Sequence, residues 1–344
     1  MEPSPHAITP HTRVFAVLGH PVRHSLSPAM HNTAFRALGM DAVYVALDIP
    51  AEKVLAALDS LAALGFGGVN LTIPHKQVAF QGIARHDESA RLVGGVNTVQ
   101  FTPEGMVGHS TDGYGLRMAV QEAFDTGLRG ADVAVLGCGG AGRSAALTAA
   151  ATGCRSLWLW NRTRSRAEAV ADEAARIAPE AKVRVMADPS EAPDGALVVQ
   201  ASASGMQGDD GFWQPAHFKP GQRLFDMIYT AAETPAMRAA RAAGAQAVNG
   251  LGMLLHQGAR SFEIWTGSSP RSPRCARRWC GPRGDSPRPP NRQAQAPGGR
   301  RFVAAVAARK SALQTVRPAV RHPRTDSPRG FGDMSAHECN AREA

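Results

Sequence analysis

Short apolar runs alternate with amphipathic stretches along the first hundred residues. The runs VFAVLG, VYVALDI and GGVNLTI are brief and rich in β-branched and aromatic residues, which favours strands. Between them, the spacing of apolar positions predicts helices over about 29–38 and 51–64. Because strands that alternate with helices build βαβ units, residues from Val14 to about Phe101 are expected to form an α/β domain around a mainly parallel sheet.

A second series of the same kind begins at Asp132. It contains the apolar runs DVAVLG, SLWLW, ALVVQ and RLFDMIY, with a glycine-rich turn and an alanine-rich helix after the first run. This repeated alternation predicts a second α/β unit. The expected organisation is one α/β domain over 13–112, a Rossmann-type domain over 113–245, and a helix over 246–267 that returns to the first domain.

The pattern ends abruptly after Gly267. Residues 268–344, here called the tail, hold ten of the 24 prolines, 16 of the 38 basic residues and only five of the 29 acidic residues. The tail has too little apolar surface to offset the entropy of ordering, so we expect a disordered basic Pro/Arg-rich segment. If 271–280 are written with G/C-ending codons, a reading shifted by two bases gives an apolar-rich helical sequence. The tail is therefore either a frameshift product or an evolved extension.

The formal net charge of +9 comes from the tail, because the rest of the chain is nearly neutral. A nucleic-acid-binding role would have to lie in the tail. The tail has no interleaved aromatic residues and no RRM, KH or zinc-finger pattern, so we expect no nucleic-acid partner.

Cysteine and histidine spacing argues against a metal site. The five cysteines form no CxxC pair, and His20, His24, His31 and His75 lack the spacing of a zinc motif. The N-terminus has no apolar signal region, and no run approaches the ~18 apolar residues that span a membrane. We expect a cytoplasmic monomer or homodimer with no metal and no membrane partner.

The segment VLGCGGAGRS has the spacing Gly137-x-Gly139-x-x-Gly142 directly after a predicted strand and before a predicted helix. Glycine at these positions allows a sharp turn and lets a pyrophosphate approach the free N–H groups of the helix N-terminus. The motif therefore predicts a dinucleotide site. A tight turn that binds nothing is the alternative.

The end of the next strand, WNRTRSR, indicates which dinucleotide is bound. An NAD site places an acidic residue about 20 residues after the glycines, but here Asn161, Arg162 and Thr163 stand in that region, with Arg164 and Arg166 close behind. Guanidinium groups bind a 2′-phosphate through forked, charge-assisted hydrogen bonds. The implied cofactor is NADP(H), although a solvated basic helix start would also explain Arg164 and Arg166.

Several further segments follow in a characteristic order. HSLSP, NLTIPHK, GGVNT and STDG precede the glycine loop, and NRT, SASGM, DMIY and GLGMLLHQ follow it. Over about 13–267 the chain resembles the NADP-dependent shikimate dehydrogenases, which reduce 3-dehydroshikimate to shikimate with NADPH. The resemblance implies a substrate-binding first domain and an NADP-binding second domain. The chain departs from the usual family forms at Leu26 and at Ser110.

The resemblance also implies roles for individual residues. Lys76 and Asp112 match the catalytic pair. The substrate-binding positions are Ser25, Ser27, Thr72, Asn97, Tyr229 and Gln257. The cofactor-binding positions are Gly137, Gly139, Gly140, Ala141, Gly142, Asn161, Arg162, Thr163, Arg166 and Gly250.

The chemistry of these residue types fits ketone reduction. Negative charge develops on the carbonyl oxygen, so a proton donor must lie within hydrogen-bond reach. A lysine positioned by a carboxylate can be that donor, and a nicotinamide supplies the hydride. Hydroxyl and amide side chains suit a polyhydroxylated ring that carries a carboxylate.

Each candidate residue also has an ordinary structural explanation. Lys76 could be a surface lysine, Asp112 could cap a helix starting near Gly113, and Ser25 and Ser27 could cap the helix that follows them. A quinate or amino-shikimate dehydrogenase of the same fold, or a shikimate sensor without turnover, is also possible. Retention of Lys76 and Asp112 argues against a sensor, and the absence of an acidic residue in NRT argues against an NAD-preferring quinate enzyme.

Overall fold

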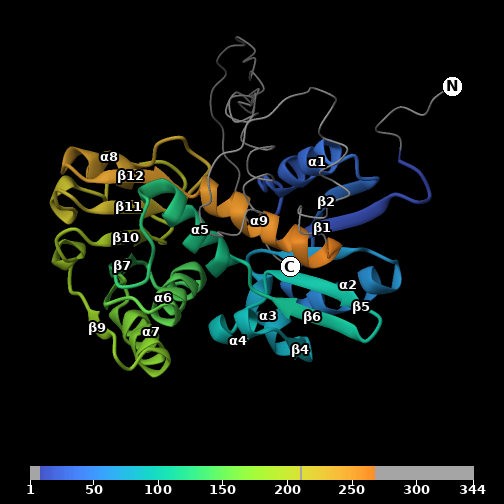
Figure 1. Cartoon of the computed structure of the whole chain (residues 1–344), viewed down its shortest axis with the longest axis horizontal. Coiled ribbons are helices and arrows are strands. Elements are labelled where there is room, and N and C mark those ends of the chain that lie inside the picture. The colour runs from blue at the N-terminus through green and yellow to red at the C-terminus, as the bar shows by residue number, and fades with distance from the viewer. Residues whose placement is uncertain (1–7, 210, 268–344) are drawn as a thin grey trace, which may run out of the picture.

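A computed structural model gives the structure of the protein (Figure 1), and residues 8–209 and 211–267 are described. The expectations about the tail concern residues 268–344 and lie outside the described residues.

The first domain contains a six-stranded sheet in the order β2-β1-β3-β5-β6-β4. Three of its five strand pairings are parallel. The pairs β3–β5 and β5–β6 are antiparallel. Strands β5 and β6 form a hairpin, because only Pro103 and Glu104 join them. The strands are β1 Arg13–Gly19, β2 Ala42–Asp48, β3 Gly68–Leu71, β4 Arg85–His86, β5 Thr98–Thr102 and β6 Gly105–His109. The helices are α1 Ser27–Ala37, η1 Ala51–Lys53, α2 Val54–Ala63, α3 His75–Gly82 and α4 Glu88–Val93.

The second domain contains a fully parallel sheet in the order β12-β11-β10-β7-β8-β9. Strands β8 and β9 follow β7 on one side, and the chain then returns to place β10 on the other side of β7. Such a change of direction creates a crevice at the carboxyl ends of β7 and β10. The strands are β7 Asp132–Leu136, β8 Ser156–Trp160, β9 Lys182–Val185, β10 Leu197–Gln200, β11 Arg223–Asp226 and β12 Gln246–Asn249. The helices are α6 Gly140–Thr152, α7 Arg164–Ile177, η2 Pro189–Glu191, η3 Pro215–His217 and α8 Pro235–Ala242.

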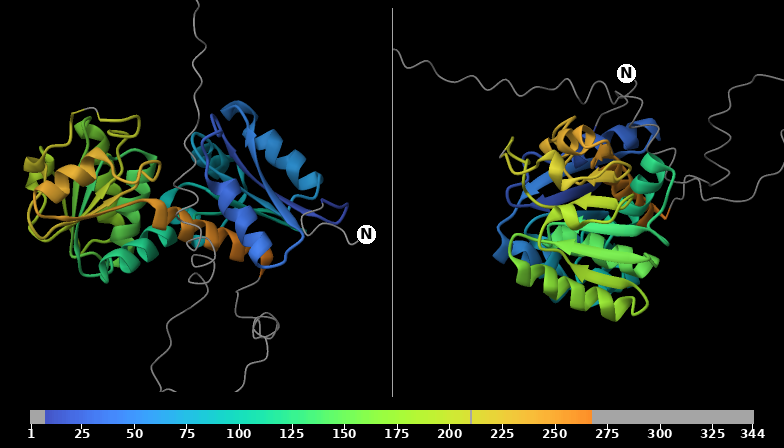
Figure 2. Two further views of the ribbon diagram at one scale, coloured as in Figure 1. Left: turned by 90° about the horizontal axis from the view of Figure 1, so that it is seen from above. Right: turned by 90° about the vertical axis from the view of Figure 1, so that its left-hand side faces the viewer.

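These two sheets confirm the expected fold class of two α/β domains, the first with a mainly parallel sheet and the second Rossmann-type. Two helices join the domains, α5 Asp112–Phe124 and α9 Leu251–Thr266. Figure 2 shows α9, in orange, running from the second domain to the first. α5 and α9 cross closely, since a Cβ added at Gly115 would lie 2.8 Å from the carbonyl oxygen of Met253.

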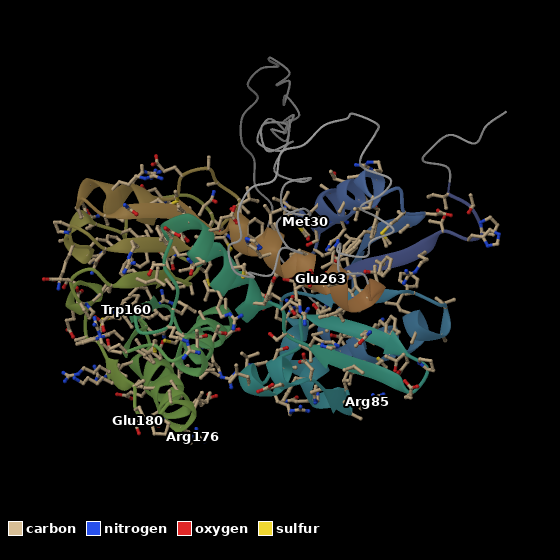
Figure 3. All side chains as sticks on the ribbon, in the orientation of Figure 1. Met30, Arg85, Trp160, Arg176, Glu180 and Glu263 are labelled. Carbon is tan, nitrogen blue, oxygen red and sulfur yellow. The ribbon has the colours of Figure 1, made fainter. Side chains whose placement is uncertain are left out.

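The far half of α9 completes the core of the first domain. Phe262 and Trp265 are buried together with Phe15, Phe35 and other apolar residues of that domain. Met30 of α1 packs on α9 at Gly258, where an added Cβ would lie 2.2 Å from the Met30 methyl group (Figure 3). Helix α9, which follows the last strand of the second domain, is therefore also part of the core of the first domain. This shared helix fixes how the two domains face each other.

Candidate active site

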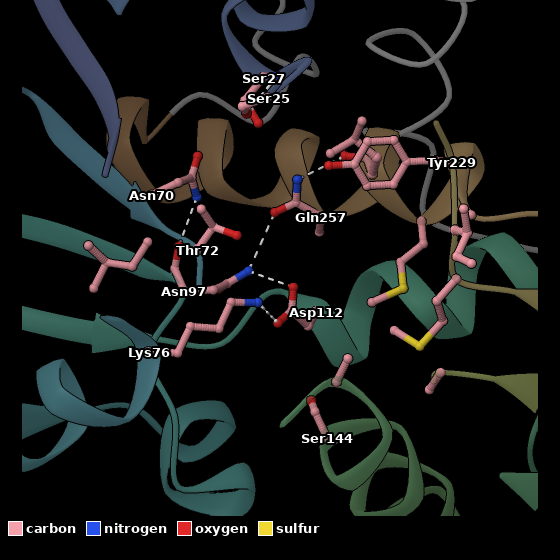
Figure 4. Close-up of a pocket in the computed structure, with 18 of the residues that line it drawn as sticks. Ser25, Ser27, Asn70, Thr72, Lys76, Asn97, Asp112, Ser144, Tyr229 and Gln257 are labelled. Carbon is pink, nitrogen blue, oxygen red and sulfur yellow. Dashed lines mark hydrogen bonds and ion pairs between the residues drawn. The ribbon is translucent and has the colours of Figure 1, made fainter. Parts of the chain in front are cut away.

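A pocket of about 220 Å³ opens between the two domains (Figure 4). Its walls come from the carboxyl ends of β1 and β3, from the first turns of α5 and α6, and from α9. The predicted residues that line it are Ser25, Ser27, Thr72, Lys76, Asn97, Asp112, Ala141, Tyr229, Gly250 and Gln257. The pocket thus brings together all of the predicted catalytic and substrate-binding residues. The remaining predicted cofactor residues do not line this pocket and are described below.

Lys76 is the second residue of α3, and its side chain points across the pocket toward α5. Its Nζ is 2.6 Å from Oδ2 of Asp112, and its side chain is about one third exposed while that of Asp112 is 16% exposed. The backbone around Lys76 is also held, because the amide of Val96 donates to the Lys76 carbonyl at 2.9 Å. Lys76 is thus a partly buried ammonium in a fixed ion pair rather than a surface lysine.

Asp112 is the first residue of α5, and its carboxylate does not cap the helix. The N-cap residue is Thr111, and no side-chain cap hydrogen bond is formed there. Instead, the second carboxylate oxygen of Asp112 accepts a hydrogen bond from the Asn97 amide at 2.9 Å. The alternative that Asp112 serves as an N-cap is therefore wrong.

Asn97 connects the ion pair to the rest of the site. Its side-chain oxygen accepts from the Thr111 amide at 2.7 Å, and its side-chain nitrogen lies 3.4 Å from Oε1 of Gln257 on α9. The residue is 3% exposed. Because a buried amide with several partners has one stable orientation, Asn97 fixes the direction of the Asp112 carboxylate.

Ser25 and Ser27 lie across the pocket from Lys76 (Figure 4). α1 begins at Ser27, and its N-cap residue Leu26 forms no side-chain cap hydrogen bond. The Ser25 hydroxyl does accept a hydrogen bond from the Ser27 amide at 3.3 Å. Ser25 therefore supports the local turn, and both serines line the pocket.

Tyr229 and Gln257 form the pocket wall between Lys76 and the two serines. Burial raises the pKa of the Tyr229 hydroxyl, so this group is a neutral hydrogen-bonding group at ordinary pH. The Gln257 side-chain nitrogen donates to the Leu254 carbonyl of its own helix at 3.0 Å, while its side-chain oxygen faces Asn97 at 3.4 Å.

Asn70 also lines the pocket, and sequence reasoning did not single it out. The hydroxyl of Tyr44 donates to its side-chain oxygen at 2.7 Å, and its side-chain nitrogen lies 2.9 Å from the hydroxyl of Ser261. All three residues are buried. A polar residue inside the apolar strand GVNL was the only available signal, since Tyr44 and Ser261 are remote in sequence.

The glycine loop has the geometry that a pyrophosphate requires. Gly137 has a φ of 101°, and a Cβ added at Gly142 would lie 1.7 Å from the Gly137 carbonyl oxygen, so the turn packs tightly on α6. At Gly139 and Gly140, by contrast, an added Cβ would meet nothing within 4 Å. The N-cap of α6 has no side-chain cap, which leaves the first amides of the helix available to an anion. The loop therefore fits a dinucleotide.

Asn161 and the arginines after it lie beside this loop. The Asn161 side-chain oxygen accepts from the Cys138 amide at 2.9 Å, and its nitrogen donates to the Thr163 carbonyl at 2.8 Å. Asn161 thus ties the glycine loop to the loop after β8. Arg162, Thr163 and Arg166 are exposed. Arg164 pairs with Glu168 at 2.8 Å, which supports the solvated-helix explanation for that residue.

Two of the histidines considered as metal ligands have other partners. His31 is fully buried and stacks on Tyr44 with ring centroids 4.3 Å apart, and burial lowers its pKa from 6.5 to about 3. His20 instead pairs with Asp48. Among residues 8–209 and 211–267 no cluster of three His, Cys, Asp or Glu side chains could hold a metal ion. No helix in the same ranges is long and apolar enough to cross a membrane.

Comparison with known proteins gives a consistent result. The family model of the shikimate dehydrogenase substrate binding domain matches residues 17–99, and that of the shikimate 5'-dehydrogenase C-terminal domain matches residues 250–271. The NADP⁺-dependent shikimate dehydrogenase of Moorella thermoacetica is 40% identical over 263 residues, which cover 74% of this chain and 88% of that protein. The chain belongs to the shikimate dehydrogenase family.

Solved structures of the shikimate dehydrogenase family and its neighbours share the fold. The shikimate 5-dehydrogenase of Thermus thermophilus, solved with NADP(H) and shikimate, is 36% identical with a TM-score of 0.67, covering 74% of this chain and 94% of its own. A quinate dehydrogenase from Corynebacterium glutamicum, solved with NAD, is 27% identical with a TM-score of 0.68, covering 75% and 94%. The family resemblance inferred from the sequence motifs is thereby confirmed.

Proposed function

We propose that the protein catalyses the reversible, NADPH-dependent reduction of 3-dehydroshikimate to shikimate, a step toward chorismate and the aromatic amino acids, with Lys76 and Asp112 as one acid-base unit. The observation that carries this proposal is the 2.6 Å Lys76–Asp112 pair, which lies in a pocket built from both domains and bordered by the glycine loop. Family membership supports the activity and the cofactor.

Lys76 is placed to move the proton. In the reductive direction the carbonyl oxygen of the substrate gains negative charge, and the Lys76 ammonium donates a hydrogen bond and then a proton to it. The cofactor supplies the hydride to the carbonyl carbon when it is bound. In the oxidative direction the neutral Lys76 amine takes the proton from the hydroxyl. The Asp112 carboxylate holds the lysine in place and stabilises its charged form.

The end of the pocket at Ser25 and Ser27, across from Lys76, suits the substrate carboxylate. The hydroxyls of Ser25 and Ser27 donate to it, while Thr72, Asn97, Tyr229 and Gln257 supply donors and acceptors for the ring hydroxyls. Both serines are at least partly buried, so hydrogen bonds to a carboxylate there face little competition from water. The substrate is thus held with its carboxylate away from the Asp112 charge.

The dinucleotide would be held by the second domain. The residues of the glycine loop that would hold the pyrophosphate are Gly137, Gly139, Gly140, Ala141 and Gly142. Gly250 lines the pocket and would contact the part of the dinucleotide that enters it. Arg162 and Arg166, with Asn161 and Thr163, receive the 2′-phosphate and its ribose. The absence of a carboxylate at 161–163 favours NADP(H) over NAD(H), because an acidic residue would repel the phosphate.

The proposed functional division follows the two sheets. Residues 13–112 provide most of the substrate site, to which Tyr229 and Gln257 also contribute, and residues 113–245 bind NADP(H). The helix expected over 246–267 is shorter than predicted, because 246–249 form β12 of the second sheet, and α9 alone returns to the substrate domain. The small-molecule partner is shikimate or 3-dehydroshikimate, and we propose a cytoplasmic monomer or homodimer.

A two-by-two rate measurement tests the proposal. Reduction of NADP⁺ and NAD⁺ is followed spectrophotometrically with shikimate and with quinate. The highest kcat/KM is expected for shikimate with NADP⁺. A preference for quinate with NAD⁺ would favour the quinate-type enzyme, and tight shikimate binding without turnover would favour a sensor.

A further inference from the structure

Arg143 reaches from the dinucleotide domain to the substrate domain. It lies in the first turn of α6, directly after the glycine loop, and its guanidinium donates to the carbonyl oxygen of Val93, the last residue of α4. The guanidinium is fixed from behind by Glu173 of α7, with Nε 3.0 Å from Oε1 and a second hydrogen bond to Oε2. An arginine held by a bidentate pair therefore bridges the two domains.

The Val93 carbonyl is a suitable acceptor. Helix C-terminal carbonyls have no partner within the helix, and a cation stabilises them. α4 ends at Gly94, which adopts the left-handed conformation with a φ of 54°, and a Cβ added there would lie 3.4 Å from an Arg143 nitrogen. Val93 is buried in the core of the second domain, and α4 packs against α6. This end of α4 is thus a genuine contact between the domains.

The segment after Val93 leads straight to the acid-base pair. The amide of Val96 donates to the Lys76 carbonyl at 2.9 Å, and the side chain of Asn97 donates to Asp112 at 2.9 Å. The backbone of Arg143 is joined to the glycine loop, since its amide donates to the Gly139 carbonyl at 2.7 Å. One side chain therefore links the loop expected to hold the pyrophosphate to the segment that positions Lys76 and Asp112.

We propose that Arg143 is a positioning residue that couples dinucleotide binding in the second domain to substrate binding in the first. This inference rests on the proposed function. An anion bound at Gly139–Gly142 would further stabilise the first turn of α6, which is already formed in the structure. It would thereby strengthen the contact through which Arg143 holds the end of α4 and residues 94–97, the segment that orients Asp112. Because coupling between two sites is reciprocal, substrate binding strengthens dinucleotide binding by the same factor.

Calorimetric titration of the full-length protein measures this coupling. The dissociation constant of shikimate is measured alone and with saturating NADP⁺, and the ratio of the two values is the coupling factor. The variants are Arg143→Met, Arg143→Lys, Glu173→Gln and the control Arg155→Met. Arg155 forms the same bidentate pair, with Asp132, but entirely within the second domain.

We expect a coupling factor of at least about five in the wild type, within the usual range for coupled sites. Arg143→Met should bring it close to one, while shikimate affinity without NADP⁺ changes less than about twofold. Arg143→Lys and Glu173→Gln should give intermediate factors, and Arg155→Met should keep the wild-type factor. In steady-state assays Arg143→Met should lower kcat more than it raises the KM for shikimate, because Asp112 is no longer oriented.

Two results would overturn the inference. One is a wild-type coupling factor of one, and the other is an Arg143→Met or Glu173→Gln protein whose factor equals that of the wild type. Thermal unfolding confirms that each variant is folded, and Glu173→Gln carries the test if Arg143→Met does not fold. A wild-type protein that turns over shikimate but shows unchanged coupling in the variants contradicts only this inference, whereas a wild type that does not bind shikimate contradicts the proposed function itself.

Discussion

Replacing Asn97 by aspartate should disable the acid-base pair without altering the shape of the pocket. The wild-type amide nitrogen lies 2.9 Å from Oδ1 of Asp112 and donates to it. In Asn97→Asp a carboxylate oxygen takes this place, so two carboxylates face each other at hydrogen-bond distance. Like charges so close cannot both ionise freely, and they must share a proton or move apart.

The magnitude follows from the lost and added interactions. A hydrogen bond to a charged group contributes roughly 1.5–3 kcal/mol, and its loss alone corresponds to about 10- to 150-fold in rate. Repulsion between the carboxylates adds to this at neutral pH. We therefore expect kcat/KM for shikimate to fall by at least about 100-fold near pH 7 and to recover partly at lower pH, where the shared proton restores a hydrogen bond.

The assay is the pH profile of shikimate oxidation with NADP⁺, together with the dissociation constant of NADP⁺. Asn32→Asp is the matched control, because the Asn32 amide donates to the backbone carbonyl of Tyr44 at 2.8 Å and not to a carboxylate. The control should keep its wild-type pH profile, and both variants should bind NADP⁺ normally. An Asn97→Asp enzyme with a loss of less than tenfold and an unshifted profile would refute the reasoning.

Three further predictions concern the cofactor, the substrate and stability. Arg162→Ala should raise the KM for NADP⁺ about 10- to 150-fold and that for NAD⁺ much less; equal effects would exclude a 2′-phosphate contact. Ser25→Ala should weaken shikimate more than an analogue that lacks the carboxylate, and equal losses in calorimetry would assign Ser25 to the helix turn alone. His31 takes up no proton in the folded state until about pH 3, whereas its ordinary pKa is 6.5, so the free energy of unfolding should fall as the pH drops through this window. The free energy of unfolding, measured by urea denaturation at several pH values, should depend less steeply on pH in His31→Phe, by up to about 1.4 kcal/mol per pH unit. An unchanged pH dependence would contradict the burial argument.

Local chain geometry made much of the molecule predictable. The strand, turn and helix around Gly137 and Gly142 follow from residues that are adjacent in sequence, and the structure shows why glycine is needed at both positions. The two α/β domains follow in the same way from alternating apolar runs. The β5–β6 hairpin was not predicted, because the first hundred residues show the alternation typical of βαβ units and the only local sign of a hairpin is the two-residue connection at Pro103 and Glu104.

Contacts between residues far apart in the sequence could not be predicted from local patterns. Motif resemblance singled out Lys76 and Asp112, but their 2.6 Å separation depends on how α3 and α5 pack. The network that orients Asn70 draws on Tyr44 and Ser261, which lie 26 and 191 residues away along the chain. Neither residue carries a local signal, because a tyrosine in a strand and a serine in a helix usually have purely structural roles.

The most direct test of the central claim is the turnover of Lys76→Ala, Asp112→Ala and the double variant with shikimate and NADP⁺. General acid-base catalysis contributes typically 10²–10⁴-fold, so each single variant should lose turnover by about this factor. The double variant should lose little more, because the two residues act as one unit. NADP⁺ affinity should be retained in all three proteins. A Lys76→Ala enzyme within tenfold of the wild-type kcat, or losses that multiply in the double variant, would contradict the account.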